Sequence, residues 1–242
     1  MQVFIADSYE AMSKQAAEDI FQLLQSIEKP VICPASGASP TGLYKALVDL
    51  IKTSGTDTSN WYFVALDEWK GMNGEDEDSC RHYLNKHLFL PLNIGEQQIC
   101  FFDGKANDLN KECEKAEKFI KEHGGISIAI LGIGVNGHIG MNEPGTPVSS
   151  RSHVAAIHAS TQQIGQKYFK QPRQIDSGLT VGLATLLEAK HLVLLASGNN
   201  KAEIMKKTMN EPASEEIPAT LLKDHPGFLV YADEEAGKFI KH

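Results

Sequence analysis

Two residues that could exchange protons lie in the glycine-rich segment 132–145, which reads GIGVNGHIGMNEPG. His138 follows the glycines, and Glu143 comes five residues later. A histidine gains and loses a proton near neutral pH, and a nearby carboxylate can orient its ring and stabilise the charged form. The segment directly follows the apolar run ISIAILG (126–132). Because ligands bind beyond the carboxyl ends of strands in open α/β sheets, we predict a ligand site here.

The glycines at 132, 134 and 137 also fit the pattern G-x-G-x-x-G of a dinucleotide-binding turn. In that turn the glycines open a helix, and an acidic residue follows about 20 residues later to hold the ribose. Here the glycine and proline residues of 140–147 forbid a long helix, and no Asp or Glu occurs between Glu143 and Asp176. The pattern therefore does not predict a nucleotide cofactor.

A second pair of acids, Asp67 and Glu68, ends the apolar run WYFVALDEW (61–69) beside Trp61 and Trp69. Burial against aromatic surface disfavours a charged carboxylate, and two adjacent acids raise each other's pKa. Such a carboxyl could act as a general base near neutral pH. The alternative is an ordinary aspartate that caps the turn after a strand.

The segment VICPASGASPTGLYKAL places four small residues between a predicted strand and a predicted helix. Free N–H groups and the helix dipole suit a phosphate there, although an ordinary capped turn is an equal alternative. The residues are Ser36, Gly37, Ala38 and Ser39. Another candidate, Lys201, lies one turn into a predicted helix, where taken alone it is more simply a solvent-exposed lysine.

Alternating strands and helices must position these residues. Apolar runs predict strands at 2–6, 30–35, 61–67, 126–132, 153–158, 191–197 and 228–233, and helical periodicity predicts helices at 8–28, 39–53, 108–123 and 199–210. Ser39 and Pro40 are expected to start the second helix. Several strands lack polar alternation, as expected for strands covered on both faces. We therefore predict an α/β fold with a mostly parallel sheet and one domain, residues 1–242.

Composition limits the partners of the chain. The 242 residues carry a net charge of -8, which argues against general binding to nucleic acid or to an anionic membrane. The apolar runs are too short to cross a bilayer, and we see no secretory signal. The four cysteines show neither a C-x-x-C pair nor zinc-like spacing with histidine, so we expect no metal site and reduced thiols in the cytoplasm.

Taken in order, the motifs closely resemble one enzyme family. SGASPTGLYKAL, FVALDEW, LGIGVNGHIGMNEPG, LTVGLATLLEAKHLVLLASGNNKAE and IPATLLKDHP are similar to the glucosamine-6-phosphate deaminases and their galactosamine-6-phosphate relatives. The resemblance implies a Rossmann-like three-layer sandwich. It also implies conversion of a hexosamine 6-phosphate to a ketohexose 6-phosphate and ammonium, without cofactor or metal.

The same resemblance assigns roles to the candidate residues. It implies that His138 opens the sugar ring with support from Asn136 and Glu143, and that Asp67 moves a proton from C2 to C1. It implies that the phosphate binds to a turn and two lysines. These residues are Ser36, Gly37, Ala38, Ser39, Thr41, Lys201 and Lys167.

Departures from the family pattern leave some questions open. Asn136 stands where some relatives have Asp, so Glu143 must carry more of the histidine's support. DEW and IPATLL favour galactosamine 6-phosphate, whereas NEPGTP and the chain length favour glucosamine 6-phosphate. His153 and Ala155 occupy positions where hexameric relatives bind an N-acetylated activator through basic residues, so we expect no such activation. The sequence does not determine the oligomeric state, since it is compatible with a single chain and with a homo-oligomer.

Two other functions fit a similar architecture. A 6-phosphogluconolactonase is a hydrolase with a related Gly-His block, but that block continues differently from NGHIGMNEPG. A sugar-phosphate-sensing effector domain of a transcription regulator would bind the ligand without turnover. The chain lacks a helix-turn-helix segment, and a sensor would have no use for the acid–base residues.

Overall fold

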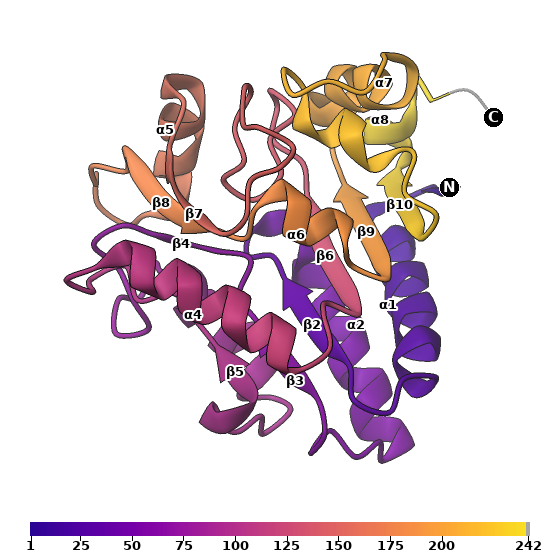
Figure 1. Cartoon of the computed structure of the whole chain (residues 1–242). Coiled ribbons are helices and arrows are strands. Elements are labelled where there is room, and N and C mark those ends of the chain that lie inside the picture. The colour runs from indigo at the N-terminus through magenta and orange to yellow at the C-terminus, as the bar shows by residue number, and fades with distance from the viewer. Residues whose placement is uncertain (241–242) are drawn as a thin grey trace.

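The centre of the molecule is a seven-stranded sheet with the order β1-β10-β9-β6-β2-β3-β5, in which all neighbouring strands are parallel (Figure 1). This computed structural model describes residues 1–240, apart from the side chain of residue 168. The strands are β1 (Gln2–Ala6), β2 (Val31–Pro34), β3 (Tyr62–Val64), β5 (Ile99–Cys100), β6 (Ile128–Gly132), β9 (His191–Ala196) and β10 (Phe228–Asp233). The predicted α/β fold with a mostly parallel sheet is confirmed.

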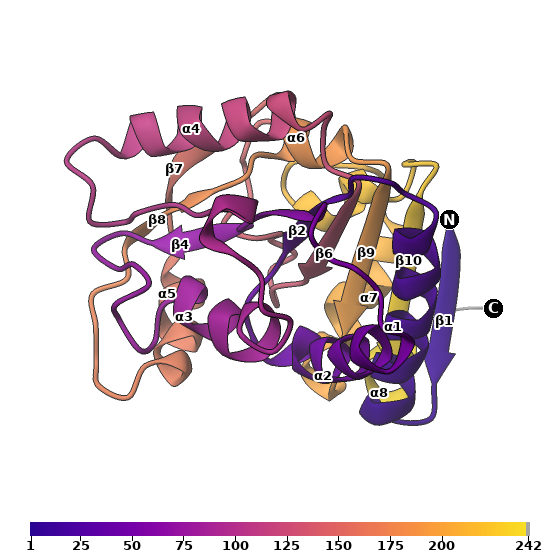
Figure 2. The same ribbon diagram turned by 90° about the horizontal axis from the view of Figure 1, so that it is seen from below.

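Helices cover both faces of this sheet. Figure 2 shows α4 (Leu109–Glu122) and α6 (Leu183–Leu187) on one side, with α1 (Tyr9–Gln25) and α2 (Ala38–Ser54) on the other. Helices α7 (Ala202–Asn210) and α8 (Glu234–Gly237) contribute buried residues to the same core as α4. Two short helices, α3 (Cys80–Leu84) and α5 (Ala159–Gly165), lie on the side of β4 (Asp67–Trp69) (Figure 2), and Leu84 of α3 packs in the core beneath α1 and α2. No helix within residues 1–240 is long and apolar enough to span a membrane.

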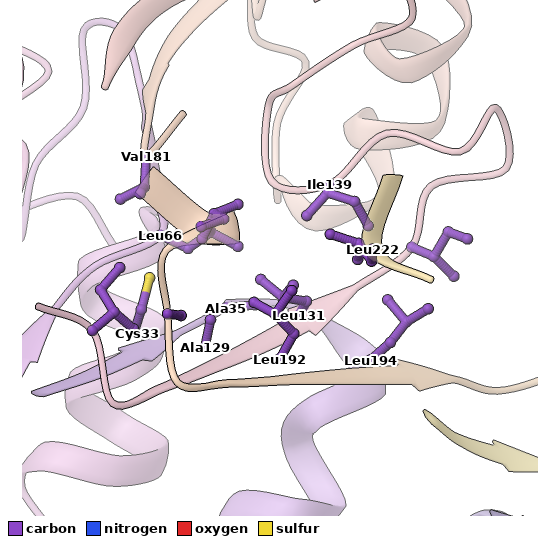
Figure 3. Packing of buried hydrophobic residues seen from close by; sticks show 14 of the residues in the cluster. Cys33, Ala35, Leu66, Ala129, Leu131, Ile139, Val181, Leu192, Leu194 and Leu222 are labelled. Carbon is purple, nitrogen blue, oxygen red and sulfur yellow. The ribbon is translucent and has the colours of Figure 1, made fainter. Parts of the chain in front are cut away.

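The two cores result from the twofold alternation of side chains along each strand. In β9, Leu192 and Leu194 face the core beneath α4 and α6, whereas Val193 and Leu195 face α1 and α2. All four side chains are fully buried. Figure 3 shows the first of these cores, where Leu192 and Leu194 lie close to Leu131 of β6. A strand that is apolar on both faces is stable only between two layers of helices, which accounts for the three-layer arrangement.

The start of α2 differs from the prediction. The helix begins at Ala38, one residue earlier than expected, and its N-cap is Gly37 rather than Ser39. Gly37 has φ of 118°, a conformation that a side chain would disfavour. The glycine therefore lets the chain turn sharply from β2 into α2. Leu43, Leu47 and Ile51, which lie on one face of the helix, are buried.

A second, three-stranded antiparallel sheet has the order β4-β8-β7. It contains β4 (Asp67–Trp69), β7 (His153–Ala156) and β8 (Ser177–Thr180). The predicted strand 61–67 is therefore divided, because Asp67 leaves the parallel sheet and pairs with Thr180 of β8. The strand predicted at 153–158 is confirmed as β7, but it pairs antiparallel with β8 outside the central sheet, and Val154 is exposed. Strands β5 and β8 were not predicted, because one is very short and the other contains glycine.

The chain reverses its direction of travel across the sheet at β2 and β6. After β2 it proceeds to β3 and β5 on one side, and it then returns to place β6, β9 and β10 on the other. Residues 33 and 34 of β2 pair with 129 and 130 of β6, so the carboxyl ends of these strands are neighbours. Connections that diverge from neighbouring strand ends leave a crevice between them. The loops that follow β2 and β6 are those that the sequence singled out.

Leu194→Ala tests the central packing. Leu194 is fully buried between β9 and the helices, so removing its side chain should lower the free energy of unfolding by about 2–5 kcal/mol in a urea titration. Leu90→Ala is the matched control, because Leu90 is 71% exposed, and it should change stability by about 0.5 kcal/mol or less. Equal losses in the two variants would contradict this packing.

Candidate active site

A cavity of about 530 Å³ opens at the carboxyl ends of β2, β6 and β9. Loops far apart in the sequence form its wall: the turn after β2, the β3–β4 connection, the loop after β6 and the segment after β9. Nine of the residues singled out in the sequence line it, namely Ser36, Gly37, Ala38, Ser39, Thr41, Asp67, His138, Lys167 and Lys201. Asn136 and Glu143 are absent from the lining and contact His138 instead.

Asp67 lines the cavity because it is the first residue of β4, which follows directly after the buried residues at the end of the β3–β4 connection. Burial raises the pKa of Asp67 to about 6, although a hydrogen bond from Cys80 and the charge of His138 act in the opposite direction. Trp69 also lines the cavity, whereas Trp61 packs into the core beneath α1 and α2. Asp67 therefore has the properties of a general base that works near neutral pH.

The neighbouring acid, Glu68, points away from the cavity. The residue is 1% exposed, and its carboxylate accepts hydrogen bonds from the backbone N–H groups of Trp69, Cys80 and Arg81 at 2.8–3.1 Å. Burial raises the pKa of Glu68 to about 7, against the opposing effect of these three donors. Consecutive strand residues face opposite ways, so the two acids have different surroundings: Asp67 faces the cavity and Glu68 anchors the start of α3.

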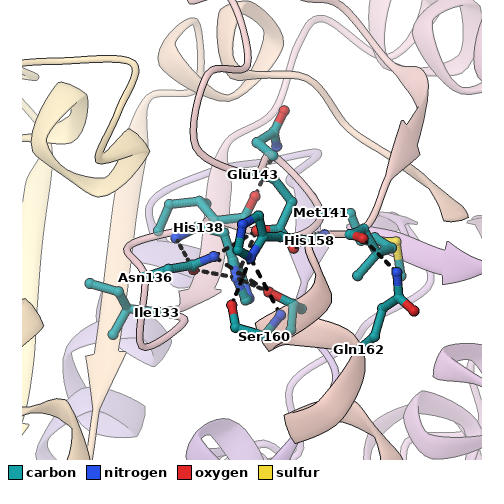
Figure 4. A network of polar contacts seen from close by, with 12 residues as sticks. Ile133, Asn136, His138, Met141, Glu143, His158, Ser160 and Gln162 are labelled. Atoms are coloured by element: carbon teal, nitrogen blue, oxygen red, sulfur yellow. Dashed lines mark hydrogen bonds and ion pairs between the residues drawn. The ribbon is translucent and has the colours of Figure 1, made fainter. Parts of the chain in front are cut away.

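His138 is held by a polar network (Figure 4). Its Nδ1 lies 2.8 Å from Asn136 Oδ1 and 3.6 Å from Glu143 Oε2, while Asn136 Nδ2 donates to the same Glu143 oxygen at 2.8 Å. In the reverse amide orientation, Oδ1 would face the Glu143 carboxylate, and two acceptor oxygens cannot form a hydrogen bond. The asparagine therefore presents Oδ1 to the histidine. An amide oxygen only accepts hydrogen bonds. Nδ1 therefore carries the proton, and Nε2 of the neutral ring can accept one.

The Glu143 carboxylate supports a positive charge on this ring. Burial by itself would raise its pKa, but the hydrogen bond and charge of His138, together with Thr161 and Asn136, lower the pKa of Glu143 to about 2. The backbone N–H of His158 donates to its other oxygen at 3.3 Å. Sequence reasoning did not find Thr161 and His158 as partners, because only the folded chain brings 158–161 beside the loop after β6.

Two glycines of this loop determine how the His138 side chain is placed. A Cβ atom at Gly134 would lie 2.2 Å from Cε1 of His138, so the imidazole packs directly on the glycine backbone. Gly137 has φ of 88°, which favours glycine, and it turns the chain immediately before His138. The G-x-G-x-x-G pattern thus arises from close packing and a tight turn around a histidine.

The turn after β2 places Ser36, Gly37, Ala38 and Ser39 at the first turn of α2. None of the backbone N–H groups of residues 36–39 donates to another group within residues 1–240, so they remain available to a ligand. The Thr41 hydroxyl is engaged in the turn itself, since it lies 3.0 Å from the Gly37 carbonyl and 2.7 Å from the Tyr83 hydroxyl, to which it can donate. The arrangement is that of an anion site at a helix N-terminus.

Lys201 ends a 3₁₀ turn (Asn199–Lys201) before α7, and its Nζ donates to the Ile133 carbonyl at 2.6 Å. The interpretation of this residue as a solvent-exposed lysine was therefore wrong. Burial lowers the pKa of Lys201 to about 8, and the charge of Lys167 acts in the same direction. Lys167 lies in the 3₁₀ turn after α5 and lines the same cavity. Two cationic side chains thus face one space, which suits a doubly charged anion.

One cysteine, Cys80, belongs to the cavity lining. All four cysteines are free and buried, and no group of three His, Cys, Asp or Glu residues within 1–240 could hold a metal ion. His153 and Ala155 lie on β7, outside the lining of the cavity.

The chain has many relatives. A family model described as glucosamine-6-phosphate isomerases/6-phosphogluconolactonase matches residues 6–230. A glucosamine-6-phosphate deaminase of Thermoanaerobacter pseudethanolicus is 36% identical over 241 residues, which covers 99% of this chain and 95% of that one. A protein of the same name from Shouchella clausii is 38% identical over 237 residues, with coverage of 98% and 96%.

Solved structures agree with this relationship. The structure of a monomeric glucosamine-6-phosphate deaminase is 34% identical, with a TM-score of 0.95 and coverage of 99% of this chain and 100% of that chain. The 6-phosphogluconolactonase of Trypanosoma brucei shares the fold with a TM-score of 0.78, but it is only 16% identical over 99% and 98% of the two chains. The protein belongs to the family of glucosamine-6-phosphate isomerases and 6-phosphogluconolactonases.

Proposed function

We propose that the protein catalyses the isomerising deamination of glucosamine 6-phosphate to a ketohexose 6-phosphate and ammonium. The observation that carries this proposal is that a half-buried carboxylate, Asp67, and an imidazole, His138, line one cavity with a phosphate-type turn and Lys201. The relatives named as glucosamine-6-phosphate deaminases, which align along almost the full chain, favour the glucosamine substrate over its galactosamine isomer.

His138 opens the sugar ring. In this step the C1–O5 bond breaks, the ring oxygen gains a proton and the C1 hydroxyl loses one, which leaves an aldehyde at C1. Nε2 of the neutral imidazole accepts the proton from the hydroxyl and returns it to the ring oxygen. The transient imidazolium is stabilised by the ionised Glu143, with Asn136 holding the ring in place.

Asp67 then moves a proton between neighbouring carbons. The aldehyde acidifies the C2 hydrogen: the carboxylate takes the C2 proton while O1 gains a proton from the protonated 2-amino group, which gives an enolamine. Delivery of the C2 proton from Asp67 to C1 converts the enolamine to a protonated imine at C2. Water adds to this imine and ammonium leaves, which gives the ketose. Because Asp67 is partly desolvated, its pKa is closer to that of the proton it must transfer than a free aspartate's would be.

The phosphate end of the substrate binds opposite the reacting carbons. We assign it to the N–H groups and hydroxyls of residues 36–39, to Lys201 and to Lys167. Thr41 supports the turn from within. The four buried, free cysteines are consistent with a reducing compartment, and we place the protein in the cytoplasm.

The lactonase alternative is less well supported. Hydrolysis of a lactone needs no base at C2, so the position of Asp67 in the cavity would have no purpose. The lactonase structures that share the fold are distant, and that of Trypanosoma brucei is only 16% identical to this chain. A purely sensing function would likewise leave the Asp67–His138 pair without a role.

Asp67→Asn tests the proton transfer. An amide cannot accept the C2 proton, so ammonium release should fall by roughly 10²–10⁴-fold, and exchange of the C2 hydrogen with solvent deuterium should be lost. Asp57→Asn is the control, because Asp57 lies outside the cavity and, within residues 1–240, accepts hydrogen bonds only from Ser59. Retained C2 exchange in the Asp67 variant would assign the base to another residue.

His138→Gln tests the ring opening. Glutamine keeps hydrogen-bonding capacity but cannot shuttle a proton, so turnover of the cyclic substrate should fall far more than turnover of an open-chain analogue. Steady-state rates on both compounds provide the comparison. Equal losses would remove the ring-opening role from His138.

The pH dependence of kcat/KM should have a bell shape. Asp67 must be ionised, so activity should rise as the pH passes about 6, and Lys201 must be protonated, so activity should fall above about 8. Lys201→Arg keeps its charge to much higher pH and should move the falling limb upward. A falling limb that stays in place would instead be assigned to the substrate amine.

A further inference from the structure

Three tyrosines from three different helices converge on the turn that follows β2. Tyr44 of α2 donates its hydroxyl to the Ala35 carbonyl at 2.6 Å. Tyr83 of α3 donates to the Gly37 carbonyl at 2.7 Å. Tyr9 of α1 donates to the Ala38 carbonyl at 2.9 Å and lies 3.2 Å from the Ser39 carbonyl. Within five residues of backbone, four carbonyl oxygens are thus contacted by phenol groups.

These contacts are built into the packing around the turn. Tyr44 is fully buried, and its ring meets that of Tyr83 edge to face with centroids 6.4 Å apart. The Tyr9 hydroxyl also accepts a hydrogen bond from Gly42 N at 2.7 Å. A Cβ atom at Gly42 would lie 3.0 Å from the Tyr9 ring and 2.5 Å from the Ser13 hydroxyl, so the glycine permits this close approach.

Peptide geometry connects the carbonyls to the donors of the turn. In a trans peptide, the C=O of one residue and the N–H of the next point in opposite directions. Fixing the carbonyls of Ala35, Gly37 and Ala38 therefore also fixes the direction of the following N–H groups, which belong to residues 36, 38 and 39. Those N–H groups have no acceptor within residues 1–240.

The phenol groups also change the electrostatics. A carbonyl oxygen beside the cavity carries partial negative charge and would repel a phosphate. Hydrogen bonds from tyrosine occupy these oxygens, and donation to a carbonyl polarises the peptide so that its N–H becomes a stronger donor. Orientation and polarisation act in the same direction, toward tighter anion binding.

We propose that Tyr9, Tyr44 and Tyr83 are positioning residues that preorganise the turn at residues 36–39 for the phosphate of the substrate. The proposal rests on the function proposed above and adds residues to its phosphate site. Tyr9 and Tyr44 do not line the cavity and act only through the backbone, whereas Tyr83 also lines it. Preorganised donors lose little freedom on binding, so removal of a phenol should weaken the binding of any phosphate compound.

Tyr9→Phe and Tyr44→Phe test this role by calorimetric titration with inorganic phosphate. Each change removes one hydroxyl and keeps the ring, and the dissociation constant should rise by about three- to tenfold. KM for glucosamine 6-phosphate should rise by a similar factor with little change in kcat, because the lost binding applies equally to substrate and transition state. If Tyr44→Phe does not fold, Tyr9→Phe decides the matter, since Tyr9 is only partly buried.

Tyr231→Phe is the matched control. It also removes a phenol that donates a short hydrogen bond, 2.7 Å to Asp19, but it lies outside the cavity and should leave phosphate binding unchanged. Unchanged binding in both test variants would overturn the proposal, as would equal weakening in the control. Absence of phosphate binding by the unmodified enzyme would overturn it as well. Ammonium release from glucosamine 6-phosphate tests the proposed function separately, because the phosphate titration requires no turnover.

Discussion

The carboxyl ends of β2 and β6 are held side by side by parallel backbone pairing, while the chain leaves them in divergent directions. This constraint creates the crevice in which the site lies. One strand end supplies the anion-binding turn, and the other supplies the loop that carries His138. The adjoining β9 brings Lys201 to the same edge, and its hydrogen bond to the Ile133 carbonyl ties two of the loops together. The fully buried strands behind them keep these ends in register.

Burial sets the protonation states within the crevice. The same desolvation that raises the pKa of Asp67 lowers that of Lys201, because in each case the charged form is disfavoured. Glu143 behaves differently, since the histidine and its polar neighbours outweigh burial and keep the carboxylate ionised. A carboxyl that can be protonated near neutral pH and one that stays charged are the two kinds of acid that the proposed mechanism needs.

Asp67 and Glu68 are neighbours in the sequence, but the folded chain gives their carboxyl groups different surroundings. Both acids end one apolar run in the sequence, and each was expected to raise the pKa of the other. The strand turns one into the cavity and the other toward the start of α3, where three N–H groups hold it. From α3, Tyr83 then reaches the turn after β2. Glu68, whose carboxylate lies outside the cavity, thereby anchors α3, and α3 contacts the turn after β2 through Tyr83.

The layered fold could be predicted from the residue pattern, because runs that are apolar on both faces require helices on both sides. The sequence also predicted the candidate site residues, because strand ends in a parallel sheet share one edge and the motifs resemble a known family. The division of the strand at 61–67, and the support of the site by Thr161 and the tyrosines, became visible only in the folded chain. Those features depend on contacts between residues tens of positions apart, and no local spacing records them.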